Sequence, residues 1–186
     1  MLSADKNVTL TEFQIQTLQI REKELNYFVN LYNAISGIAA MLAGFGFSSL
    51  KMQFPSTTST VLQIVYLAIT ASAIGLELCA ILNSACCSVF GPGKFLRGKQ
   101  GLESAEKAVQ VLEEKSEITL TYFMLGLYSI VLSSAFKAFI LYTLWNACVV
   151  SAGLVFMSYL LINSGRRIFN NMYVDKHKAI TGKIDR

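Results

Sequence analysis

"LNYFVNLYNAISGIAAMLAGFGFSSL", residues 25–50, contains no charged residue. A helix that crosses the hydrocarbon core of a bilayer needs about 20 predominantly apolar residues, so this run is long enough for one crossing. Three more charge-poor runs follow: residues 52–93, where Glu77 is the single charged residue, residues 118–136 and residues 138–165. Because backbone polar groups in lipid must be satisfied within the spanning segment, each run predicts a helix.

The whole composition supports this interpretation. Only 15% of the residues are charged, whereas a soluble domain carries about 25%. The sequence therefore predicts an all-α, polytopic membrane protein with four transmembrane helices in a lipid bilayer. The expected spans lie near Leu31–Leu50, Val61–Cys87, Ile118–Tyr142 and Trp145–Ile162.

The basic residues predict an orientation. Of the 16 lysines and arginines, three precede the first span, five follow the second and six lie in the tail, while Lys51 and Lys137 occupy the other two loops. The positive-inside rule then places both termini and the middle loop in the cytoplasm. We expect a cytoplasmic helical extension over 1–30, the membrane domain over 31–165 and a basic tail over 166–186.

Three of the helices are expected to extend beyond the membrane. Thr11 is a candidate N-cap for a first helix that either protrudes into the cytoplasm or begins as an amphipathic helix on the membrane surface. The stretch "FGPGKFLRGKQG", residues 90–101, is rich in turn formers and predicts a loop. The helical pattern of residues 102–120 then predicts that the third helix begins in the cytoplasm. Apolar residues from Ile168 onward predict that the fourth helix either extends or bends outward.

Few residues of the chain suit catalysis. The single histidine, His177, lies in the tail, and no cysteine has zinc-ligand spacing with it. We therefore expect no enzyme activity, no metal site, no cofactor and no nucleic-acid partner. Cys86 and Cys87 lie near the cytoplasmic end of the second span, where they are either small packing residues or S-palmitoylation sites.

Glu77 is the one ionisable residue inside a predicted span, and such residues indicate a functional site by default. Asn33 and Asn163 are expected at a similar depth and are candidate hydrogen-bond partners. A structural glutamate that fixes helix rotation is the favoured interpretation. A role in ion permeation or gating is the alternative. A proton site in a transporter is less favoured, because four spans without inverted repeats make a small transporter.

The first span is rich in small residues. Gly37, Ala40 and Gly44 share one helical face, and Ala39, Ala43 and Phe47 share an adjacent one. Small residues at this spacing permit close helix packing. A stripe at helical spacing is also a candidate pore lining: Gly37, Met41, Gly44, Phe45, Ser48 and Met52. Residue type alone favours packing over a pore.

Three stretches are similar to the Orai family of calcium-release-activated calcium channels, distantly and in the order of the spans. "LAGFGFSSLKMQ" (42–53) resembles its first span, "GLELCAILNSACC" (75–87) its second and "AGLVFMSYLLINSGRRIF" (152–169) its fourth. The resemblance covers roughly residues 30–175. It implies a plasma-membrane homo-oligomer, a hexamer in the family, with first helices around a central pore lined by the stripe above.

This sequence departs from the family at its functional positions. Met52, with Lys51 beside it, stands where the family has its acidic selectivity ring, and Glu77 stands where the family has a histidine. A calcium filter needs carboxylates to replace the water around the ion. The resemblance thus implies an Orai-like channel with altered or lost calcium selectivity. The alternative is a non-conducting accessory subunit of a larger membrane complex, for example an energy-converting complex in an organelle.

Overall fold

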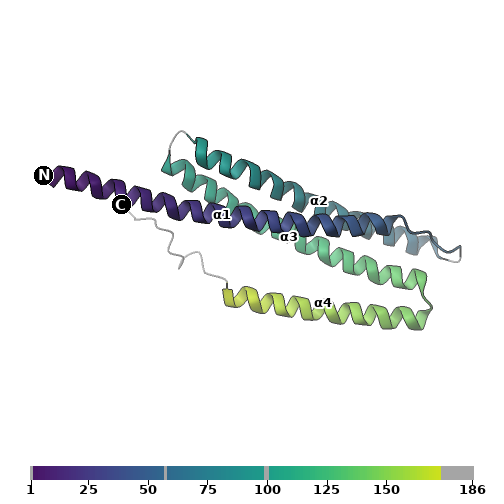
Figure 1. Ribbon diagram of the computed structural model, residues 1–186. Helices are drawn as coiled ribbons and strands as arrows, with labels where there is room; N and C mark the ends of the chain where they lie inside the picture. Colours follow the sequence, from purple (N-terminus) through teal and green to yellow (C-terminus); the bar gives the residue numbers. More distant parts are fainter. Residues whose placement is uncertain (1, 57, 99–100, 173–186) are drawn as a thin grey trace. The chain divides into compact units, whose positions relative to one another are not determined.

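The computed structural model describes residues 2–56, 58–98 and 101–172, and nearly all of them are helical (Figure 1). Over this part of the chain there is no strand, and four α-helices follow one another: α1 (Leu2–Leu50), α2 (Thr60–Arg97), α3 (Leu102–Leu141) and α4 (Leu144–Met172). All four are long and apolar enough to cross a membrane. The prediction of an all-α chain with four such helices is confirmed.

The first three helices are longer than a bilayer requires. They contain 49, 38 and 40 residues, which correspond to lengths of about 74, 57 and 60 Å against a hydrocarbon core of about 30 Å. The predicted helix start at Thr11 is wrong, because α1 begins at Leu2. The first 36 residues contain no glycine and no proline, so nothing in their backbone chemistry ends the helix.

The loop predicted over residues 90–101 is also wrong in most of its length, because α2 continues through Pro92 to Arg97. A proline inside a helix removes one backbone hydrogen bond and normally bends or ends the helix. Tertiary packing opposes this effect here. A methyl group added at Gly91 would lie 3.0 Å from the side chain of Leu112, and Phe95 packs against the buried core. The chain turns instead at Gly101, whose φ is +55°, a conformation that glycine adopts without strain.

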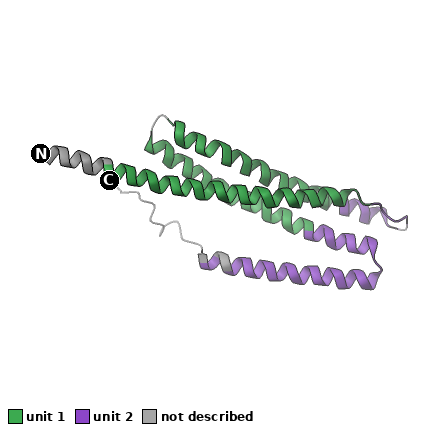
Figure 2. Ribbon diagram, in the orientation of Figure 1, with its two compact units in different colours: residues 1–52, 68–130 green, residues 53–67, 131–186 purple. Residues whose placement is uncertain are grey.

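The chain divides into two compact units (Figure 2). Unit 1 comprises Met1–Met52 and Ala68–Ile130, and unit 2 comprises Gln53–Leu67 and Val131–Arg186. Unit 1 therefore holds α1, most of α2 and most of α3, whereas unit 2 holds the connection between α1 and α2, the start of α2, the end of α3 and all of α4. The contacts within each unit are described separately below.

In unit 1, α2 runs antiparallel to both α1 and α3. A hydrogen bond joins Ser88 to Asn33, while Gly46 lies against Ile74 thirteen residues further along α1, which sets the register between α1 and α2. Gly91 lies against Leu112 and Gly126 against Glu77, which sets the register between α2 and α3. The three helices thus form one bundle along most of their length.

A hydrophobic cluster fixes the charged end of this bundle, which we call the basic end. Its buried members are Leu25 and Tyr32 of α1 and Val109 and Leu112 of α3. The Tyr32 hydroxyl donates a 2.6 Å hydrogen bond to the carbonyl oxygen of Leu112. Since Val109 and Leu112 come from a charged segment of α3, their burial against α1 removes apolar surface from water and stabilises the bundle. The protruding and the membrane-surface forms of the first helix both stay predictions.

Unit 2 is poorer in buried side chains. The rings of Phe54 and Tyr66 meet edge to face with centroids 6.0 Å apart, and Gln63 Nε2 donates a hydrogen bond to the carbonyl oxygen of Thr58. α4 exposes large apolar side chains such as Trp145 and Val149.

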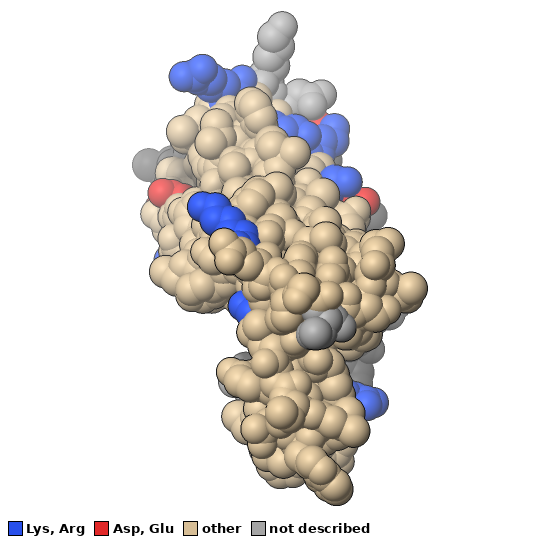
Figure 3. Space-filling view, turned by 90° about the vertical axis from the view of Figure 1, so that its right-hand side faces the viewer, with Lys and Arg blue, Asp and Glu red and all other residues tan. Residues whose placement is uncertain are grey.

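Most of the surface in Figure 3 carries neither acidic nor basic side chains. This surface is of the kind that lipid or other membrane helices cover.

Candidate functional site

α1 has two different faces within unit 1. The face toward α2 and α3 is closely packed, and a methyl group added at Gly46 would lie 2.5 Å from Cγ1 of Ile74. Along this face every third or fourth residue is buried: Tyr32, Ile35, Ala39, Ala43 and Gly46. Small residues at these positions let the helices approach closely. Close packing in this unit therefore uses Ala39, Ala43 and Gly46.

The opposite face of α1 carries most of the predicted pore lining. Met41 is 68% and Phe45 65% exposed, and added methyl groups at Gly37 and Gly44 would meet nothing within 4 Å. We call this face the exposed stripe: Gly37, Met41, Gly44, Phe45 and Ser48. Two faces were predicted to suit close packing. Ala39 and Ala43 of one face are buried, whereas the other face, Gly37, Ala40 and Gly44, is exposed.

Met52, the last predicted pore residue, lies beyond the helix. α1 ends at Leu50, and the N–H groups of Lys51 and Met52 bond the carbonyl oxygens of Ser48 and Ser49, three residues back. Tightened bonds of this kind are common at helix ends. Met52 is half-buried and Lys51 exposed. Lys51 thus follows directly after the helix that carries the exposed stripe.

Glu77 lies at the centre of unit 1 with no exposed surface. Neither carboxyl oxygen has a hydrogen-bond partner among the residues that the structure describes. The side chain packs against Gly126 of α3, where an added methyl group would lie 2.6 Å from Oε1. The absence of a side chain at Gly126 therefore makes room for the carboxyl group. A buried polar group without a partner is costly. The interpretation of Glu77 as a structural glutamate stays a prediction.

The helix registers show what surrounds Glu77. The Gly46–Ile74 contact places Ala43 of α1 level with Glu77. One heptad away on the same face of α2, Ser84 is also buried and its hydroxyl lacks a hydrogen-bond partner in the described part of the chain. The α2–α3 register places Ser84 level with Thr119, whose hydroxyl bonds the carbonyl oxygen of Lys115 on its own helix. Polar groups thus recur along the centre of the bundle, where Glu77 meets Gly126 and Ser84 lies level with Thr119.

The prediction of Asn33 as the partner of Glu77 is wrong. Asn33 Oδ1 instead accepts a 3.1 Å hydrogen bond from the hydroxyl of Ser88, three turns along α2 from Glu77. The sequence placed the two residues at a similar depth, but the close Gly46–Ile74 contact shifts α1 so that Ala43 takes that level. Asn163, the other candidate, is exposed on α4.

Sequence reasoning did not single out Arg21, which is buried at the basic end. Its guanidinium bonds Glu24 of the same helix at 2.7 Å and lies 3.8 Å from a carboxyl oxygen of Glu106 on α3. In sequence Arg21 is one of several charges in "REKE". Nothing in that pattern distinguishes the buried arginine from its exposed neighbours, so only the packing of α1 on α3 identifies it.

The remaining predicted positions are the cysteines, the expected absence of a metal site and the basic tail. All four cysteines are free, with Cys79, Cys86 and Cys148 exposed and Cys87 half-buried. In the described ranges no three His, Cys, Asp or Glu side chains are grouped closely enough to hold a metal ion. His177 and the end of the basic tail lie outside these ranges. The expectation that the chain binds no metal stays a prediction.

Comparisons with protein families, with curated proteins and with solved structures found no match to this chain.

Proposed function

We propose that this chain is one subunit of a homo-oligomeric membrane channel of the Orai type, in which the α1 helices of several copies surround a central path. The observation that carries the proposal is the two-faced α1. One face is packed on α2 and α3, while the exposed stripe opposite combines three small residues with Met41 and the aromatic Phe45. A ring of copies around an axis would turn such a face toward the path.

The packing of unit 1 gives the stripe a fixed direction. Ala43 and Gly46 hold α1 close to α2, and Tyr32 bonds α3 at the basic end. Rotation of α1 would break these contacts and drive a larger side chain into Ile74. Glu77, being fully buried on α2, does not belong to the stripe. Its role in the proposal is to set the rotation of α2 against Gly126 of α3.

The proposed channel has altered or lost calcium selectivity. The stripe offers a hydroxyl at Ser48, a thioether at Met41 and backbone surface at Gly37 and Gly44, but no carboxylate. Selective coordination of a divalent cation requires a ring of oxygen ligands with sufficient negative charge. The ammonium of Lys51 next to the stripe would repel divalent cations further. We infer either a weakly selective path or one that does not carry calcium.

Ion flux through the purified full-length chain in liposomes tests this proposal, with Ser48→Trp as the variant. Ser72→Trp is a matched control, because both serines are exposed and both bond the carbonyl oxygen four residues back on their own helix. The proposal predicts measurable flux that Ser48→Trp abolishes and Ser72→Trp leaves within about twofold. Equal flux in all three proteins would contradict the assignment of the path.

A non-conducting accessory subunit of a larger complex is the second candidate. The missing carboxylates on the stripe favour it. In that case the exposed stripe would be the surface against which a helix of a different protein packs, and Gly37 and Gly44 would permit the close approach. Absence of flux, together with co-purification of unrelated chains in fixed ratio, would decide for this candidate.

A further inference from the structure

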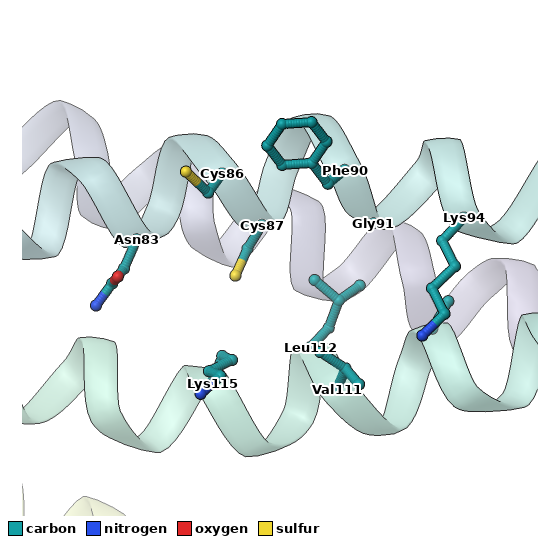
Figure 4. A pocket seen from close by; sticks show the side chains of 10 residues that line it. Asn83, Cys86, Cys87, Phe90, Gly91, Lys94, Val111, Leu112 and Lys115 are labelled. Atoms are coloured by element: carbon teal, nitrogen blue, oxygen red, sulfur yellow. The ribbon is translucent and has the colours of Figure 1, made fainter.

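A pocket of about 290 Å³ lies between α2 and α3 at the basic end of unit 1 (Figure 4). Its walls are mainly apolar and include Phe90, Val111 and Leu112, and a lysine from each helix lines it as well, Lys94 from α2 and Lys115 from α3. In Figure 4 the side chain of Lys94 extends from α2 toward α3. The pocket therefore combines an apolar surface with two lysine ammonium groups that come from different helices.

The pocket lies where the apolar runs of both helices end. Lys94 is the first charged residue after the long apolar run of α2, and Lys115 is the last basic residue before that of α3. The contact of Gly91 with Leu112 sets the helix register and places Lys115 level with Ser88. The two lysines are thus offset by six residues, about 9 Å along the bundle. Both lysines lie just beyond the predicted ends of the membrane spans, at Cys87 on α2 and Ile118 on α3.

Neither lysine ammonium forms a salt bridge with any residue that the structure describes. Lys107 on the same helix differs, because its ammonium lies 2.6 Å from Glu103. Exposed apolar side chains also gather beside the pocket: Phe90 is 70% and Val111 44% exposed. Unpaired cations beside exposed apolar surface, at the level of lipid headgroups, match the chemistry of an anionic amphiphile.

We propose that this pocket binds an anionic phospholipid, with the phosphate between Lys94 and Lys115 beside Phe90 and Val111, and with the start of an acyl chain along Cys86 and Cys87 toward the membrane. The volume is near the lower end of the range for small-molecule sites, about 300–1,000 Å³. It suits a headgroup with the start of one chain rather than a whole lipid, whose remaining length lies in the bilayer. The proposal does not depend on whether the chain conducts ions.

The two lysines and the apolar wall of the pocket together indicate the kind of ligand, an anionic lipid. Lysines alone would bind a free phosphate in water as readily as a phospholipid headgroup. The apolar wall adds affinity only for a ligand that carries hydrocarbon, because burial of apolar surface is favourable in proportion to its area. A lipid with a neutral headgroup would use the wall but gain nothing from the two cations. The pocket therefore discriminates in favour of a ligand with both features.

Native mass spectrometry of the full-length protein in detergent tests the proposal. The protein is titrated with phosphatidylglycerol, with phosphatidylcholine of the same acyl chains and, separately, with glycerol 3-phosphate. The test variant is Lys94→Gln with Lys115→Gln. A double variant of the same charge change, Lys107→Gln with Lys51→Gln, is the control, because neither of those residues lines the pocket. Val111→Trp blocks the apolar wall without changing the charge.

We expect phosphatidylglycerol to bind the native chain more tightly than phosphatidylcholine does. Loss of both pocket lysines should weaken that binding by about tenfold or more, since each basic residue beside an anionic headgroup contributes several-fold. The control variant should bind as the native chain does, and Val111→Trp should also weaken lipid binding. Equal loss in the control would show general attraction to charge and overturn the site. Glycerol 3-phosphate binding as tightly as the lipid would overturn the lipid assignment.

Discussion

At the scale of single residues, glycines on α2 and α3 differ in what their missing side chains leave room for. Gly126 leaves room for the buried carboxyl of Glu77, whereas Gly75, on the same helix as Glu77, has open space around it. Replacing a helical glycine by alanine favours the helix by about 1 kcal/mol in both places. What separates the two positions is the neighbour that the new methyl group would meet.

Gly126→Ala is therefore expected to destabilise the protein although it improves helix propensity. The methyl group would lie 2.6 Å from Oε1 of Glu77, and such overpacking costs about 1–3 kcal/mol. Gly75→Ala, the control, should be neutral or stabilising. The measurement is the melting temperature of the detergent-solubilised protein, followed by loss of the folded peak in gel filtration.

A double-mutant cycle identifies the cause of this effect. In a Glu77→Ala background the obstruction is gone, so Gly126→Ala should no longer lower the melting temperature. A decrease of the same size in both backgrounds would show that the two side chains do not meet, and the central position of Glu77 in unit 1 would have to be revised.

At the scale of helices, the sequence predicted the existence of the elements better than their ends or their faces. The charge-poor runs indicated four helices, because lipid leaves few alternatives to a helix. The turn formers around Pro92 predicted that α2 ends near residue 90. The helix instead continues, because Gly91 and Phe95 pack on distant parts of the chain. Which face of α1 is buried was not predictable either. Small residues occur on both faces, and only the contact of Gly46 with Ile74 distinguishes them.

The contact of Gly46 with Ile74 predicts how substitutions on the two faces of α1 change the melting temperature. Gly46→Ala should lower the melting temperature, because its methyl group would lie 2.5 Å from Ile74 and cost about 1–3 kcal/mol. Gly44→Ala, two residues away on the exposed stripe, should leave the melting temperature unchanged or raise it slightly. The reverse order of the two variants in a thermal-stability assay would mean that the buried and exposed faces of α1 have been exchanged.

At the scale of the whole molecule, much apolar surface has no partner within the chain. Met41 and Phe45 on α1 and Trp145 on α4 are all more than 60% exposed. A bilayer covers part of such a surface, but the glycines of the exposed stripe favour close contact with protein or an open path over contact with lipid chains. The sequence could not predict which of these covers α1, because that depends on copies or partners beyond one chain.

The central claim is that identical chains assemble around their first helices, and the mass of the native complex tests it most directly. After gentle solubilisation of the membrane in which the chain resides, native mass spectrometry should give a whole-number multiple of the chain's own mass. Resemblance to the Orai family points to six copies. The Ser48→Trp and Ser72→Trp proteins should assemble alike, so that a difference in their flux reports on the path and not on assembly. The mass of a single chain, or of a complex that contains one copy together with different proteins, would contradict this assembly. The exposed stripe would then be a surface on which other helices pack.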